Sequence, residues 1–415
     1  MPKHDPIEPI PASGTPQQLG QAFGGVNSQA ISLHLAAFLE TCTANGLDEA
    51  AVIAASQSGL RIIRDLAPWW EQELDALAEA AGVSPALYKA FSIGKYRNLF
   101  FGEPECTSYA ATGSYIAFPA GTCFHKSRDN VSRLQCAFVR RVEDRAHNPY
   151  AWCGTSDTSD ATTMMFVNEH GLAGSADTGG KDLSFYGEGL MNTFSLRYIA
   201  ETCRDCNEAL ATLECWTEKR YSAGGSIKTN YMFSDAGGNI LRVVQSKDSV
   251  EPQMTTEDIV MNCHRKRLES DLLRAAGHLD AFALSEASRI KSVSMPSTIS
   301  SLSVDCRPEQ PELLTCAWFA LGQPTRAPYV PVFVASRNVP RALLDGSIYR
   351  RSLASRARLR EIRALESHFK QRADECLEDA RELIECGQAK AISKLTERVT
   401  ADCVREVLDK MPGDV

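Results

Sequence analysis

Five residues near the end of the first third of the chain have side chains suited to covalent chemistry. Cys106 is followed by two small hydroxyl residues, Thr107 and Ser108, and both Lys126 and Asp129 come shortly afterwards. A thiol attacks a carbonyl group only as the thiolate, which a nearby cation favours, while a carboxylate orients the proton donor or the base. The grouping predicts a cysteine nucleophile assisted by a lysine and an aspartate.

Two short β-type runs are expected to position these residues. The first run starts at Cys106, the second ends at Lys126–Asp129, and a turn-like segment with proline and glycine at 118–121 separates them. This pattern predicts a hairpin or a pair of neighbouring strands, so the head of the first run meets the tail of the second. The chain holds 14 cysteines, and the ordinary role of any one of them is that of a small buried apolar residue.

Composition narrows the class of protein. A net charge of −8 argues against a nucleic-acid partner, and the chain has no run of 18 apolar residues. The first twenty residues lack the apolar core of a signal peptide, so we expect a cytoplasmic protein without a membrane segment and with reduced cysteines. The chain contains one Cys-x-x-Cys pair, Cys203 and Cys206. No second such pair and no spaced histidine pair is present to complete four zinc ligands, so we expect no metal site.

The predicted secondary structure changes twice along the chain. Residues 1–105 are helical in pattern after a proline-rich arm, residues 106–345 contain short β-rich runs, and residues 346–415 are helical and charged. Strands are predicted at 135–142, 162–167, 231–234 and 241–245. A helix is predicted from 196 to 210.

Several conspicuous residues are expected to have structural roles. For Trp69 and Trp70, helix packing is favoured over contact with a substrate. The pair Cys203 and Cys206, at i and i+3 of the predicted helix, is expected on one face and assigned to packing, with a redox role as the alternative. The apolar positions within 350–372 fall at helical spacing, which favours an amphipathic helix docked on the domain over a basic interaction patch. That helix can also serve as a contact in a homo-oligomer.

The stretch around Cys106 resembles the nucleophile region of the N-terminal-nucleophile hydrolases that act on linear amides. The branch it resembles contains the acyl-coenzyme A:isopenicillin N acyltransferases and is peptidase C45-like. The positions that match are Cys106-Thr107-Ser108 and His125–Asp129. Further similar segments lie at 14–24, 67–84, 168–173, 196–209, 230–236, 259–264 and 317–332, so the resemblance extends over nearly the whole chain.

This resemblance implies an α+β fold, a four-layer αββα sandwich with a helical N-terminal segment and C-terminal helices. It also implies that the precursor cleaves itself between Glu105 and Cys106. Residues 1–105 would then be a propeptide or α fragment, residues 106–345 the catalytic core and residues 346–415 a helical extension. The freed α-amine would act as general base, because a model α-amine has a pKa of about 7.7–8.0.

The resemblance also implies roles for other residues. Asn262 would stabilise the tetrahedral oxyanion, and Lys126 and Asp129 would orient and charge the nucleophile. The positions implied for substrate binding are Ser175, Asp177 and Thr107. For Asp177, a loop aspartate that binds its own backbone is the alternative. The neighbouring His264 is given no role.

Together these features predict an autoprocessing cysteine amidohydrolase or acyltransferase that cleaves a linear amide of a small molecule through a Cys106 thioester. No cofactor is expected, although an acyl-coenzyme A can be a substrate. The alternative is an unprocessed, non-catalytic protein that binds an amide metabolite or a partner protein, and Glu105 favours it because relatives have glycine there. A third hypothesis makes Cys123 or Cys153 the working thiol, although neither begins a recognisable motif.

Overall fold

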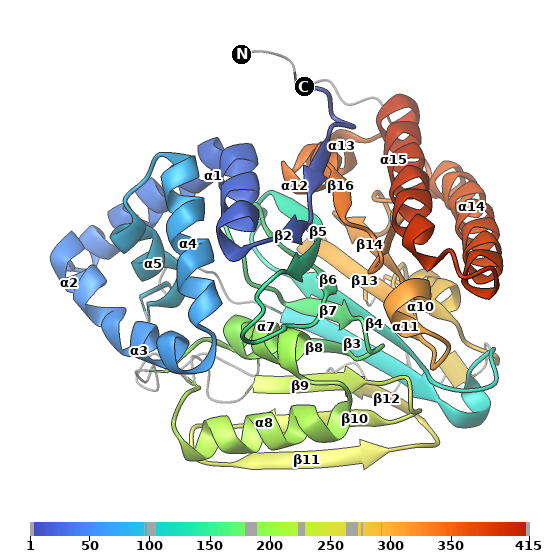
Figure 1. Cartoon of the computed structure of the whole chain (residues 1–415), viewed down its shortest axis with the longest axis horizontal. Coiled ribbons are helices and arrows are strands. Elements are labelled where there is room, and N and C mark those ends of the chain that lie inside the picture. Colours follow the sequence, from blue (N-terminus) through green and yellow to red (C-terminus); the bar gives the residue numbers. More distant parts are fainter. Residues whose placement is uncertain are drawn as a thin grey trace.

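The computed structural model describes residues 4–94, 96–97, 105–178, 189–222, 229–262, 273–274, 277–291 and 293–411. Within these ranges two large β-sheets lie face to face, and helices cover their outer faces (Figure 1). The predicted α+β class and four-layer αββα sandwich are confirmed.

One sheet has eight strands in the described part of the chain and is antiparallel except for the parallel pairing of β2 with β5. Its strands, in order across the sheet, are β11 (Val250–Thr255), β10 (Ile240–Gln245), β9 (Thr229–Ser234), β8 (Ala173–Thr178), β7 (Met165–Asn168), β6 (Trp152–Asp157), β5 (Gln135–Val142) and β2 (Ser13–Gly14). The strands predicted at 135–142, 231–234 and 241–245 are confirmed, whereas the one predicted at 162–167 begins only at Met165.

The second sheet has six antiparallel strands over the same described ranges. They are β12 (Ile259–Asn262), β3 (Glu105–Thr112), β4 (Thr122–Asp129), β13 (Thr298–Cys306), β14 (Cys316–Leu321) and β15 (Tyr329–Phe333). A separate pair joins β1 (Pro9–Pro11) to β16 (Asn338–Pro340). The strands β3 and β4 therefore lie inside the sheet, with a neighbour on both sides.

Helices pack on the outer face of each sheet (Figure 1). On the eight-stranded sheet lie α7 (Asn192–Thr202) and α8 (Cys206–Glu218). On the six-stranded sheet lie α10 (Ala281–Ala287), α14 (Leu359–Glu385) and α15 (Ile392–Lys410), with the shorter α11 (Pro311–Leu314), α12 (Arg341–Leu344) and α13 (Ser347–Ala354) nearby. Among the helices described, none is both long and apolar enough to span a bilayer.

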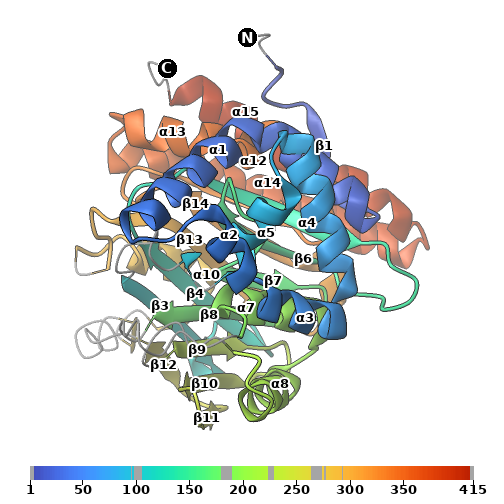
Figure 2. The same cartoon turned by 90° about the vertical axis from the view of Figure 1, so that its left-hand side faces the viewer.

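The N-terminal segment forms a group of helices beside the sheets, seen from their own side in Figure 2. These are α1 (Pro16–Ala44), α2 (Glu49–Ala55), α3 (Gln57–Leu66), α4 (Pro68–Ala81) and α5 (Pro85–Ile93). The helices α1 and α4 pack at very short range, and Gly20 permits this because it has no side chain. A Cβ atom at Gly20 would lie 2.3 Å from the carbonyl oxygen of Glu73. Thr15 caps α1 in a capping box with Gln18, and Pro16 lies in the first turn of the helix.

A buried ionic network joins these helices to the sandwich. Glu73 on α4 forms ion pairs with Arg140 on β5 and Arg197 on α7, and Arg197 Nε donates to Glu201 at 2.9 Å. The indole N–H groups of Trp69 and Trp70 both donate to Glu201 Oε2, at 2.7 and 2.6 Å. The two tryptophans are thus buried anchors of the helical segment, as their packing interpretation predicted.

The single helix predicted from 196 to 210 is wrong, because the chain forms two helices there. The side chain of Asp205 accepts hydrogen bonds from the backbone N–H groups of Asn207 and Glu208 and so caps a new helix. Cys203 ends α7 and Cys206 begins α8, so the two thiols do not share one helix face. Both are buried, which agrees with a packing role.

Candidate active site

Cys106 lies at the head of β3, paired with the tail of β4 in an antiparallel hairpin. The register sets Glu105 opposite Asp129, Cys106 opposite Arg128 and Ser108 opposite Lys126. The predicted hairpin is confirmed. Because side chains alternate along a strand and opposed residues share a face, Cys106 and Ser108 point to the same side as Lys126 and Arg128.

That side faces the other sheet. Ser108 Oγ lies 2.9 Å from Ser175 Oγ on β8, and it donates to the Asp177 carboxylate, 3.0 Å from each oxygen. Lys126 forms an ion pair with Asp177 and donates to the Ala176 carbonyl oxygen at 3.0 Å. Among the described residues, the Asp177 carboxylate therefore binds groups of the opposite sheet. Contact of Ser175 or Asp177 with a substrate stays a prediction.

Asn262 extends the same row of side chains, because it stands opposite Ser108 on the neighbouring strand β12. Its Oδ1 accepts a hydrogen bond from Arg242 Nε at 3.1 Å. An arginine can only donate, so the amide oxygen must face Arg242 and the Nδ2 group must point elsewhere. Nδ2 is buried and has no hydrogen-bond partner among the described residues.

The amide of Asn262 is close to the nucleophile. Since Ser108 pairs with Asn262, Cys106 is a diagonal cross-strand neighbour of Asn262. Residues in that relation have Cα atoms about 7–8 Å apart, which longer side chains can bridge. The strand register thus places Cys106 and Asn262 on one face of neighbouring strands, and the predicted oxyanion role of the Asn262 amide stays a prediction. The residues after Asn262 in this motif, Cys263 and His264, lie outside the described part of the chain.

The charge of Lys126 is set by its surroundings. Burial lowers the pKa of Lys126, whereas Cys106 and the Asp129 carboxylate act to raise it. Asp129 accepts a hydrogen bond from Thr298 Oγ1 and lies opposite Glu105 in the register. Lys126 is in the row of Ser108, whereas by strand alternation Asp129 points to the face away from Cys106 and Lys126, so its role toward the nucleophile stays a prediction.

Other candidate groups lie elsewhere. Thr107 is buried and, by strand alternation, points away from the face that carries Cys106, so its role toward a substrate stays a prediction. Cys123 and Cys153 are fully buried, and burial raises the pKa of both thiols, whereas Cys106 is only half-buried. Over the ranges described, no three His, Cys, Asp or Glu side chains are grouped to hold a metal ion.

Sequence reasoning named Ser108 and Arg128 within the matched segments without giving either a partner, and it missed Arg242. Ser108 and Arg128 share the face of Cys106 and Lys126, and the two-residue period of the predicted strands was a signal that could have shown this. Arg242 lies on β10 and meets Asn262 only because the two sheets pack together. No local signal in the sequence links these two residues.

The fold and the site define a four-layer αββα sandwich with a half-buried cysteine at the head of an inner strand. No protein-family profile matches the chain, and no curated protein matches it. Among solved structures it is similar to the penicillin V acylase of Agrobacterium tumefaciens, with 16% identity and a TM-score of 0.36 over 55% of this chain and 86% of that chain.

Two further solved structures are similar in the same way. An N-acylethanolamine-hydrolyzing acid amidase ortholog from Caenorhabditis elegans has 10% identity and a TM-score of 0.37 over 48% of this chain and 92% of that one. A mutant of the conjugated bile acid hydrolase from Clostridium perfringens has 11% identity and a TM-score of 0.31 over 52% and 89%. With values this low, the chemistry of the site rests on its own residues.

Proposed function

We propose that the protein is a cysteine amidohydrolase that cleaves a linear amide bond of a small molecule, with Cys106 as nucleophile. The observation that carries this proposal is the buried Nδ2 group of Asn262, which has no acceptor in the described residues and lies next to the strand head that carries Cys106. A buried donor without a partner costs about 1–3 kcal/mol, so it calls for an explanation. An oxyanion formed on the carbonyl group that Cys106 attacks would be its acceptor.

The first reaction is the release of the Cys106 α-amine. Cys106 Sγ attacks the carbonyl carbon of Glu105, and the peptide C–N bond breaks as a thioester forms. Water then hydrolyses the thioester, which leaves a carboxylate at the end of residue 105 and a free α-amine on Cys106. Asp129 lies opposite Glu105 in the strand register, a position from which its carboxylate can hold the new ammonium group.

The second reaction is amide cleavage. The Cys106 α-amine accepts the thiol proton, and the thiolate attacks the substrate carbonyl carbon. Asn262 Nδ2 donates to the oxyanion, the C–N bond breaks, and the leaving amine takes the proton from the α-ammonium group. Water completes the cycle by hydrolysing the thioester, and transfer of the acyl group to an amine is the alternative outcome. Lys126, held by Asp177 and the Ala176 carbonyl group, is a fixed N–H donor on the same face, and Asp177 balances its charge.

The test begins with the intact mass of the denatured protein, for the wild type and for Cys106→Ala. We expect two fragments that divide between Glu105 and Cys106 in the wild type and one uncut chain in the variant. The processed protein should then cleave N-acyl amides, and a β-lactam should add its mass to the peptide that begins at Cys106. A single uncut wild-type chain that no β-lactam modifies would overturn the proposal and favour the non-catalytic binding protein.

A further inference from the structure

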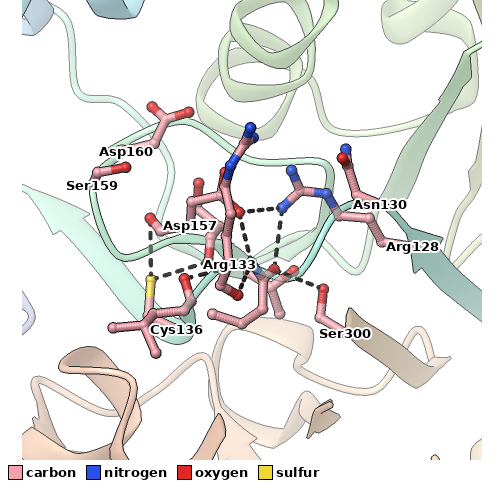
Figure 3. A network of polar contacts seen from close by, with 12 residues as sticks. Arg128, Asn130, Arg133, Cys136, Asp157, Ser159, Asp160 and Ser300 are labelled. Carbon is pink, nitrogen blue, oxygen red and sulfur yellow. Dashed lines mark hydrogen bonds and ion pairs between the residues drawn. The ribbon is translucent and has the colours of Figure 1, made fainter. Parts of the chain in front are cut away.

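A cluster of arginines surrounds Asp157, with Arg128 on the tail of β4 and Arg133 in the loop that follows it (Figure 3). Arg128 Nη1 donates to Asp157 Oδ1 at 2.8 Å and to Gln135 Oε1 at 3.1 Å. Arg133 Nη1 lies 3.9 Å from Oδ2 of the same Asp157. One aspartate on β6 thus faces two guanidinium groups.

A third guanidinium group extends the cluster. Arg97 forms a buried ion pair with Asp160, which lies three residues after Asp157. The side chains of Arg128 and Arg133 are only 7% and 9% exposed. Burial lowers the pKa of Arg133 to about 10; Asp157 acts to raise it, and the charges of Arg128 and Arg97 add to the lowering. Asp157 and Asp160 offset two of the three positive charges, so the cluster keeps a net positive charge that favours an anion.

The cluster adjoins Cys106. Arg128 is the direct cross-strand partner of Cys106, and such partners have Cβ atoms about 4.5–5.5 Å apart on one face of the sheet. Burial opposes the charge of Arg128, but Asp157 and, further away, Cys106 raise its pKa. Arg128 therefore stays a cation, on the face of the sheet that also carries Cys106.

One edge of Arg128 makes no hydrogen bond to a described residue. Its Nη1 donates hydrogen bonds to Asp157 and Gln135, whereas its Nε is buried and has no hydrogen-bond partner in the described part of the chain. A guanidinium group binds a carboxylate best through two parallel N–H groups, and the Nε edge provides such a pair. A lysine at this position would provide only a point charge.

We propose that Arg128, with Arg133 behind it, forms a carboxylate-binding subsite next to Cys106, so that the amides cleaved here carry a carboxylate a few bonds from the scissile carbonyl group. This inference names the substrate class and rests on the proposed function. Two chemistries satisfy it. The carboxylate can belong to the amine half, as in an N-acyl amino acid, or to the acyl half, as in an N-succinyl amide.

The first experiment needs no substrate. Iodoacetate and iodoacetamide alkylate thiols and differ in charge, and mass spectrometry gives both rates for each cysteine of the folded chain. We expect the ratio of the iodoacetate rate to the iodoacetamide rate to be about 10-fold higher at Cys106 than at the exposed Cys386, which is the internal reference. Arg128→Gln and Arg133→Gln should each lower the ratio at Cys106 toward that of Cys386.

A matched variant controls for the loss of an arginine. Arg141→Gln removes a half-buried cation on β5 that pairs with Glu169, and it should leave the ratio at Cys106 unchanged. If Arg128→Gln fails to fold, Arg133→Gln carries the test, because its contact with Asp157 is longer. An equal ratio at Cys106 and Cys386 in the wild type would overturn the subsite, and so would a Cys106 ratio that neither variant changes.

The second experiment decides between the two halves of the substrate. N-phenylacetylglycine is compared with neutral N-phenylacetylglycinamide, and N-succinylbenzylamine with neutral N-butanoylbenzylamine. We expect the carboxylate of one pair to raise kcat/KM about 10- to 100-fold, and Arg128→Gln to remove most of that preference. Cleavage of both pairs without preference would overturn the subsite and leave the amidase proposal standing. An unprocessed protein that cleaves none of the four would overturn both.

Discussion

Two buried polar regions of this protein are built in opposite ways. In the network between the N-terminal helices and the sandwich, two arginines face two glutamates, and the indole N–H groups of neighbouring tryptophans complete the contacts of Glu201. In the row beside Cys106, Lys126 and Asp177 neutralise each other, but Asn262 keeps a buried N–H group without an acceptor in the described residues. In the first network each charge has an opposite charge beside it, although Arg140 Nε and Glu73 Oε1 make no hydrogen bond to a described residue, whereas in the row beside Cys106 the open group is a side-chain amide donor.

Two buried asparagines make the same contrast at the level of one side chain. Asn168 donates through Nδ2 to the carbonyl oxygens of Ala200 and Cys203, at 3.0 and 2.7 Å. Its Oδ1 accepts from the N–H groups of His170 and Leu172. Asn262 has only the contact with Arg242 at its oxygen. Asn168 should therefore matter for stability and Asn262 for catalysis.

The largest expected effect is on stability, at the centre of the balanced network. Glu73→Gln leaves Arg140 and Arg197 without the carboxylate that they share, so the free energy of unfolding should fall by about 3–5 kcal/mol. Urea unfolding measures this loss. The control is Glu71→Gln on the same helix, whose partners Arg64 and Lys89 lie nearer the surface, and it should cost less than about 1 kcal/mol. Equal losses for the two variants would contradict a special role for the network.

The next effect is on catalysis, at the open donor. Asn262→Ala removes the proposed oxyanion donor, so kcat for amide cleavage should fall by about 10²–10³-fold. The free energy of unfolding should change by only about 1 kcal/mol, because the deleted Nδ2 group has no partner in the described residues and the deleted Oδ1 accepts a single hydrogen bond, from Arg242. Steady-state kinetics and urea unfolding on the same preparation test both halves. An unchanged kcat would remove Asn262 from the mechanism.

Asn168→Ala is expected to lower stability and to leave catalysis unchanged, which is the reverse of the effect of Asn262→Ala. It removes four hydrogen bonds and leaves buried carbonyl and N–H groups unpaired, so the free energy of unfolding should fall by about 2–3 kcal/mol. The kcat of the protein that remains folded should equal that of the wild type. A loss of kcat comparable to that of Asn262→Ala would contradict the assignment of Asn168 to stability and Asn262 to catalysis.

The smallest effect concerns pH and the C-terminal helices. Burial raises the pKa of Glu366 on α14 to about 7, although Arg289 pairs with it. A raised pKa means that the native state holds the proton more tightly, so this contribution to stability is present below pH about 4.5 and is lost as pH rises through 7. The wild type should lose roughly 2 kcal/mol more than Glu366→Gln between pH 5 and 8 in urea unfolding. Parallel pH profiles for the two proteins would contradict this.

Local patterns in the sequence determined much of the fold. The helical N-terminal segment, several central strands and the hairpin that carries Cys106 were predicted because apolar period, turn residues and caps act over a few neighbouring residues. The helix break at Cys203–Asp205 was missed, since one aspartate cap outweighed an otherwise continuous helical pattern.

The sequence by itself determined the residue types of the site and the hairpin that joins Cys106 to Lys126. Only the tertiary structure decided which partners these residues meet. Asp177 reaches Lys126 across two packed sheets, Arg242 orients the Asn262 amide from another sheet, and Asp157 faces both arginines beside Cys106. Such contacts depend on strand order and register over separations of 20 residues or more, which no local pattern encodes.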